Sequence, residues 1–190
     1  MNKLLCFVAF NLLIFLAGCS QEQTFEDLIA PSSDKIMTNN FRSEKLGYSI
    51  SLLKNLTLTD TEYTSDYSIE VFIDTVMFEQ SSVRSISIMR IEKRNSSLEK
   101  QWKSLTGKRK LPANYEVKST GTTNFLKELS YYEHISVSNA PNKDFETITF
   151  LTKGDVGVYY CICITCGMDD NYPVDIKKLL QCVKTFSVAD

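Results

Sequence analysis

The stretch "VGVYYCICIT", residues 156–165, indicates how the C-terminal half of this chain folds. Every second residue from Val156 to Ile164 is bulky and apolar, whereas the positions between them hold glycine, tyrosine, cysteine and threonine. Successive side chains of a strand point to opposite faces, so one face of this strand must pack on a core. "DFETITFLT" (144–152) precedes it, and "KGD" between the two carries the glycine that short hairpin loops favour. The pattern predicts a β-hairpin.

Similar alternation elsewhere predicts further strands at 46–53, 68–74, 83–93, 115–120 and 129–138, with Gly121 marking a turn. A helical period interrupts it twice. The first helix follows a predicted capping box of Ser96 and Glu99, places Leu98, Trp102 and Leu105 on one face, and ends at Gly107.

The second predicted helix is "PVDIKKLLQCVKTF" (173–186), with Pro173 in its first turn, Asp175 at its positive end and an apolar face of Ile176, Leu179, Leu180 and Val183. The order of elements is three strands, a helix, four strands and a helix. We therefore expect an α+β fold, an antiparallel sheet of about six to seven strands flanked by two main helices. Residues 41–190 have the length of a single domain.

The N-terminus has the three-part layout of a secretory signal, with Lys3, an apolar run over residues 4–15 and the small-residue site "LAGC" (16–19). The run is too short to span a hydrocarbon core of about 30 Å comfortably. "LAGC" resembles the lipobox of bacterial lipoproteins. The resemblance implies a signal peptide at 1–18 and diacylglycerol on the sulfur of Cys19, with palmitate-type acyl chains holding the protein on a membrane.

Residues 19–40 are interpreted as the lipidated cysteine and a flexible tether, although "TFED" (24–27) could cap a turn of helix. Such a tether could reach about 70 Å when stretched. Localisation is expected at the cell envelope. Ser20, rather than aspartate, follows the lipidated cysteine, which favours the outer over the inner membrane in a Gram-negative cell.

Charge is distributed unevenly along a chain whose formal net charge is −2. Residues 20–80 carry eleven acidic and four basic side chains, whereas 84–110 carry nine basic and two acidic ones. A positive edge could contact an anionic surface, and otherwise it is a solvated face. The basic residues lack the aromatic interleaving that is used for stacking on bases, so no nucleic-acid partner is expected. The candidate contact residues are Lys100, Lys103, Lys108, Arg109 and Lys110.

Cysteines offer the main chemical alternative. Cys161 and Cys163 share a strand face, and Cys166 has the opposite parity. The cluster lacks the paired ligand sets of structural zinc sites, so no metal or other cofactor is expected. It also ends a strand rather than beginning a helix, where reactive thiols are found.

Structural roles for the thiols are favoured, either as buried free cysteines or in a disulfide. If the last helix folds back along the strand, its rise of about 12 Å from Val174 places Cys182 over Cys161 or Cys163. His134 has no evident acid or nucleophile beside it in sequence and is interpreted as a packed residue, with a general base as the alternative.

Three segments resemble the PsbP-like family, which includes bacterial envelope lipoproteins such as DcrB: "FRSEKLGYSISLL" (41–53), the strands around the Trp102 helix, and "VGVYYCICIT" with the helix ending "VKTFSV". The proline and tryptophan usual after the first strand are missing from "LLKNLTL" (52–58). The resemblance implies a non-enzymatic binding or assembly module with a protein partner in the envelope. The alternatives are a thiol-redox or metal-binding protein using Cys161, Cys163 and Cys166, and a toxin-neutralising lipoprotein.

Overall fold

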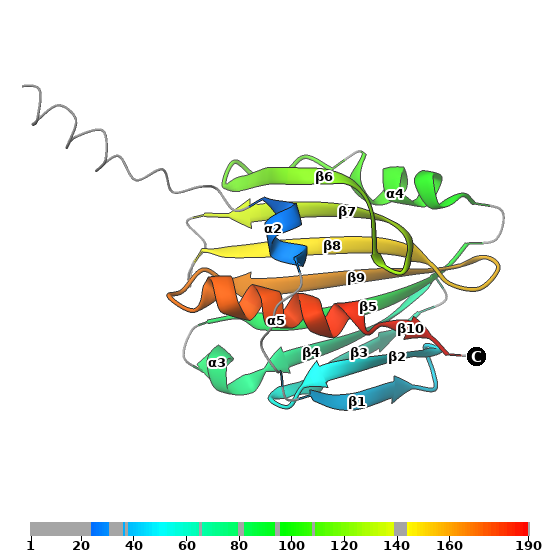
Figure 1. The fold of residues 1–190 in the computed structure, drawn as a ribbon. Coiled ribbons are helices and arrows are strands. Elements are labelled where there is room, and N and C mark those ends of the chain that lie inside the picture. Colours follow the sequence, from blue (N-terminus) through cyan, green and yellow to red (C-terminus); the bar gives the residue numbers. More distant parts are fainter. Residues whose placement is uncertain are drawn as a thin grey trace, which may run out of the picture.

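Two antiparallel sheets and four helices make up the part of the chain that the computed structural model describes, which is residues 24–30, 36, 38–64, 66–79, 82–93, 96–107, 109–138 and 144–189 (Figure 1). The large sheet has the strand order β3-β4-β5-β9-β8-β7-β6 and the small sheet β1-β2-β10. The helices are α2 (Phe25–Ile29), α3 (Thr75–Glu79), α4 (Leu98–Thr106) and α5 (Tyr172–Lys184). The strands are β1 (Thr38–Ser43), β2 (Tyr48–Leu53), β3 (Leu56–Tyr63), β4 (Tyr67–Asp74), β5 (Arg84–Glu92), β6 (Tyr115–Leu126), β7 (Glu128–Val137), β8 (Phe145–Lys153), β9 (Val158–Gly167) and β10 (Ser187–Val188). The expected α+β class, with an antiparallel sheet of seven strands, is confirmed.

The hairpin of β8 and β9 lies at the centre of the large sheet, and β9 pairs with β5 on its other side. As predicted, the alternate residues Tyr160, Ile162 and Ile164 are buried in the main core. The small sheet, α5 and α2 cover this face, and Figure 1 shows α5 lying along it. The opposite face of β9 packs through Tyr159 on Trp102 of α4 in a smaller second core.

Helix α5 is held on the sheet by its apolar face and by the partly buried guanidinium of Arg84 in β5. Ile176, Leu179, Leu180 and Val183 are fully buried, as the sequence predicts. At the first turn, the Nη2 atom of Arg84 pairs with Asp175 and lies 3.6 Å from Oδ2 of Asp169, while its Nη1 atom lies 3.9 Å from Asp74. Removing one partner of such a buried pair would leave an uncompensated charge.

The small sheet is joined to the large one through the buried carboxylate of Glu70 in β4. Ser43, at the end of β1, donates a hydrogen bond to it over 2.8 Å, and Tyr48, at the start of β2, donates one over 2.5 Å. These two hydroxyl donors stabilise the Glu70 carboxylate, whose burial without hydrogen bonds would destabilise the fold.

Helix α2 lies within the segment predicted to be a tether. Thr24 and Asp27 form the capping box that "TFED" suggested. The Phe25 ring stacks on Tyr132 of β7, with centroids 3.7 Å apart and planes 10° from parallel, and Leu28 is buried beside it. The core of the described part of the chain therefore includes Phe25 and Leu28, which lie within the segment 19–40 interpreted as a tether.

Other details differ from the sequence predictions. Ser97, not Ser96, caps α4, because its side chain accepts from the backbone of Lys100. Leu105 is exposed on α4, although Gly107 ends the helix as expected. Gly121 does not form a turn but lies inside β6, where an added Cβ would lie 3.2 Å from the ring of Tyr132. None of the helices in the described part of the chain has the length and hydropathy needed to cross a membrane.

The packing of α2 leads to a first prediction. We expect Phe25→Ala to lower the free energy of unfolding by about 3 kcal/mol, because the lost ring leaves a cavity against Tyr132. Denaturant unfolding measures it, with the exposed neighbour substitution Glu26→Ala, expected to change stability by less than about 0.5 kcal/mol, as the control. Equal stability of the Phe25→Ala variant and the unaltered protein would show that α2 adds nothing to the fold.

Candidate functional site

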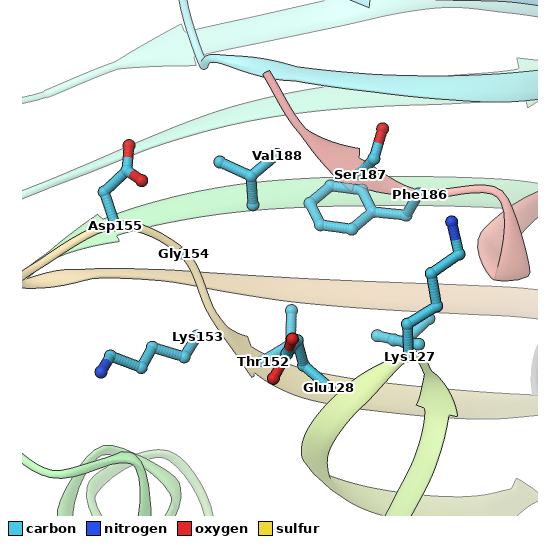
Figure 2. A pocket seen from close by; sticks show the side chains of 10 residues that line it. Lys127, Glu128, Thr152, Lys153, Gly154, Asp155, Phe186, Ser187 and Val188 are labelled. Atoms are coloured by element: carbon cyan, nitrogen blue, oxygen red, sulfur yellow. The ribbon is translucent and has the colours of Figure 1, made fainter. Parts of the chain in front are cut away.

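A groove of about 370 Å³ with apolar and charged lining residues lies at one end of the sheets (Figure 2). Three segments that are far apart in sequence form it: the β6–β7 turn, the β8–β9 hairpin and the C-terminal strand β10. We call it the β10 groove. Its lining residues are Leu126, Lys127, Glu128, Thr152, Lys153, Gly154, Asp155, Phe186, Ser187 and Val188.

One wall of the β10 groove is a strand whose outer edge pairs with no other strand in the described part of the chain. β10 pairs with β2 on one side and is the last strand of the small sheet on the other. Ser187 and Val188, its two residues, both line the groove. An unpaired strand edge presents backbone N–H and C=O groups that can pair with another extended chain.

The rest of the groove combines an apolar floor with charges of both signs. Phe186 is buried and belongs to the main core, while Lys127, Lys153, Glu128 and Asp155 surround the opening (Figure 2). Such a surface suits a polypeptide, whose backbone and side chains offer apolar, cationic and anionic groups together.

The backbone at the groove is tightly constrained. Lys127 has φ 71° in the one-residue turn between β6 and β7, the left-handed region that a non-glycine residue rarely adopts. Gly154 approaches the Tyr160 ring so closely that an added Cβ would lie 2.6 Å from it. Strained backbone held in place by its surroundings is found at many binding sites.

The four domain cysteines are free thiols in the structure and do not form one cluster. Cys161 belongs to the α4 side of the sheet, whereas Cys166 and Cys182 are buried in the main core on the other side. Cys163 shares the face of Cys161 by strand alternation. The sequence placed Cys182 over Cys161 or Cys163, but α5 packs on the opposite face of β9, so the predicted bond is not formed.

Burial makes these thiols poor nucleophiles. Desolvation raises the pKa of Cys161 and of Cys166 to about 12, that of Cys182 to about 11, and that of Cys163 above its ordinary value. Because the thiolate is the nucleophile and the metal ligand, the arrangement favours packing over redox or metal chemistry. Within the described ranges, no group of three or more His, Cys, Asp and Glu side chains could hold a metal ion.

Basic residues predicted to contact an anionic surface have different environments. Lys100 and Lys110 are exposed, Lys103 lies 2.5 Å from Glu99 one turn earlier in α4, and Arg109 pairs with the buried carboxylate of Glu133 in β7. Arg109 therefore attaches its segment to the sheet while remaining partly in contact with solvent. Lys108 and Cys19 lie outside the described residues.

His134 is buried and has partners that the sequence does not reveal. Its Nε2 atom lies 2.5 Å from Oε2 of Glu146 in β8, and the Tyr172 hydroxyl donates to the same oxygen. Burial alone would raise the pKa of Glu146, but the hydrogen bonds from His134 and Tyr172 outweigh it, so the pKa is lowered. His134 also lines a cavity of about 290 Å³ between the start of α2 and the first half of β6. The packed-residue interpretation of His134 fits this network.

No protein-family model matches the chain, and no curated protein sequence matches it. Solved structures do resemble it. Mog1, a Ran-binding protein of Saccharomyces cerevisiae, superposes with a TM-score of 0.52 at 12% identity over 82% of this chain and 97% of its own.

Two further structures give the same result. The PsbP protein CyanoP of Synechocystis sp. PCC 6803 superposes with a TM-score of 0.53 at 13% identity, over 83% of this chain and 96% of its own. A mutant form of Mog1 superposes with 0.51 at 11% identity, over 82% and 97%. The chain thus has a PsbP-like fold, as the sequence resemblance implied.

The environment of the thiols leads to a second prediction. At about pH 8, we expect a thiol reagent to label the native domain far more slowly than the urea-unfolded chain, because a pKa of about 12 instead of 9.0 leaves about a thousandfold fewer thiolates. The neutral thiols stabilise the folded state below pH 9.0, and this contribution is lost as the pH rises toward about 12. Immediate labelling of the native protein would favour a reactive thiol.

Proposed function

We propose that this protein is a membrane-anchored lipoprotein of the bacterial envelope that binds a protein partner and catalyses no reaction. The binding element is the β10 groove, which receives an extended segment of the partner. The observation that carries the proposal is the unpaired edge of β10 beside an apolar and charged cavity.

Strand addition at β10 accounts for the composition of the groove. In this mode, backbone hydrogen bonds to an edge strand supply affinity, and pockets for alternate side chains supply specificity. The groove offers the apolar surface of Phe186 to one side chain of the segment and the ammonium of Lys127 or Lys153 to an acidic one. A cavity of about 370 Å³ has room for two or three residues of the partner.

The shared fold supports a binding role only through its similarity to solved structures. Mog1, which shares the fold, is described as Ran-binding. The likeness does not transfer that partner to this chain, because folds are reused for unrelated partners. It supports the class of activity that we assign here, which is protein binding.

Membrane attachment rests on the lipobox. Cys19 follows Leu16, Ala17 and Gly18, and we infer that cleavage before Cys19 leaves an acylated N-terminus in the envelope, on the outer membrane of a Gram-negative cell. The thiol-redox and metal alternative is less well supported, since the thiols of Cys161, Cys163 and Cys166 lie on two faces of the sheet and their pKa values are raised.

Anchoring is tested by Cys19→Ala. We expect the unaltered protein to fractionate with membranes and its N-terminal peptide to carry the mass of acyl chains, because several chains give stable attachment. The Cys19→Ala variant should lose both properties. As a control, Cys6→Ala, within the signal region, should leave the mature protein unchanged. An unacylated protein that retains Met1 would contradict the proposal.

Partner binding is tested by photo-crosslinking in intact cells. A photoreactive amino acid at position 153 should capture one protein partner, identified by mass spectrometry, and Lys127→Glu should reduce the yield, because it reverses a charge that lines the groove. The matched control is Lys110→Glu, at another exposed lysine that lies outside the groove, which should leave the yield unchanged. Capture that depends on Lys110 and not on Lys127 would place the partner on the basic residues between Lys100 and Lys110 instead.

A further inference from the structure

The chain between the proposed anchor and the folded domain is short. Thr24 already caps α2, so five residue steps separate it from Cys19. A fully extended chain covers at most about 3.6 Å per residue, which limits this connection to about 18 Å. The domain cannot stand about 70 Å from its membrane unless α2 detaches from it.

Detachment of α2 is opposed by its contacts. Phe25 and Leu28 are both buried in the main core, and each side chain contributes about 1.5–3 kcal/mol by leaving water. A five-residue helix has no stability of its own, so α2 exists only while it is packed on the domain. The anchor is consequently tied to the part of the surface where α2 begins.

Strand register identifies that part of the surface. Thr24 and Phe25 share a cavity with Glu116 to Ser119, in the first half of β6. Tyr115 at the start of β6 pairs with Val137, which pairs with Phe145, which pairs with Gly167 at the end of β9. These residues define one end of the large sheet, which we call the α2 end. The β10 groove includes the β6–β7 turn and therefore lies toward the opposite end.

Exposed apolar side chains gather at the α2 end. Tyr115 and Val117 are exposed on β6, Met168 follows β9 and accepts a 3.9 Å contact from Ser136 of β7, and Val174 is exposed in the first turn of α5. Val174 is also near α2, since Lys177 one turn later lies close enough to Asp27 to interact with its charge. Three strand spacings of about 4.8 Å separate β6 from β9, so these side chains lie within reach of one membrane surface.

Charges at the α2 end, which include the exposed carboxylates of Glu26, Asp144 and Asp170, fit the polar headgroup layer rather than the hydrocarbon interior. Glu116 lies 3.2 Å from Lys118, and Lys178 lies 3.5 Å from Asp175. Pairing lowers the net charge that this surface brings to the lipid, while the exposed tyrosine, valines and methionine can enter the interfacial layer.

We propose that the acylated protein rests on its membrane by the α2 end, with Tyr115, Val117, Met168 and Val174 in the headgroup layer and the β10 groove facing away. This inference rests on the proposed acylation of Cys19. In this orientation the α2 end contacts the lipid surface that carries the anchor. The groove then remains accessible to a protein that approaches from the aqueous side.

The test places a second tryptophan at each end of the acylated full-length protein in vesicles of phosphatidylethanolamine and phosphatidylglycerol. The two variants are Val174→Trp at the α2 end and Leu129→Trp at the start of β7, side chains with 47% and 55% exposure. Brominated lipids quench tryptophan that touches the bilayer. Native Trp102, a buried residue of α4, contributes the same background emission in both variants and in the unaltered protein.

Vesicle binding should shift the emission of the Val174→Trp variant to shorter wavelength, and brominated lipid should reduce that emission, while the Leu129→Trp variant should match the unaltered protein. Acylated protein in which neither tryptophan is quenched, or in which Leu129→Trp is quenched instead, would overturn the orientation and leave the proposed function standing. Mass spectrometry of the same sample reports the acyl chains, and their absence would overturn both proposals together.

Discussion

The stacking of Phe25 on Tyr132 is the contact on which the placement of the N-terminus depends. It converts a polar N-terminal segment into part of the core, because a five-residue helix cannot form without tertiary contacts. The capping box of Thr24 and Asp27 sets where the helix begins. Together these contacts shorten the free connection to the proposed anchor at Cys19 from about twenty residues to about five. A connection this short keeps α2 close to the membrane and therefore limits how the domain is oriented on it.

A second set of contacts shapes the opposite end of the molecule. β10 follows α5 directly, so the position of the groove wall depends on how α5 is held. Arg84 fixes its first turn through Asp175, and the apolar face fixes the remainder. The carboxylate of Glu70 attaches the small sheet, which pairs with β10. The groove therefore lies where α5, the small sheet and the large sheet meet, and the outer edge of β10 forms one of its walls.

Most of the large sheet could be predicted, because its central strands bury one face and therefore show a strict period of two in the sequence. β3 could not, since Leu56 is its only buried residue, and the two-residue β10 is too short to leave a pattern. The groove draws on three distant segments, so no local motif indicates it. Strand alternation predicts that Cys161 and Cys163 share a face of β9. It does not predict which face α5 covers, and the position of Cys182 depends on that. His134 was isolated in sequence because Glu146 reaches it only through the register of β7 and β8.

The central claim, that α2 is packed on the domain and not part of a free tether, is tested most directly by hydrogen exchange of the α2 backbone in the acylated, membrane-bound protein. The amide of Leu28, which donates to the carbonyl of Thr24 over 3.1 Å, is the probe. We predict that it exchanges far more slowly than an unstructured peptide, with the protection lost in the Phe25→Ala variant. Exchange of Leu28 at the unstructured rate in the unaltered protein would show that the segment is a free tether, and the account of its orientation would then be wrong.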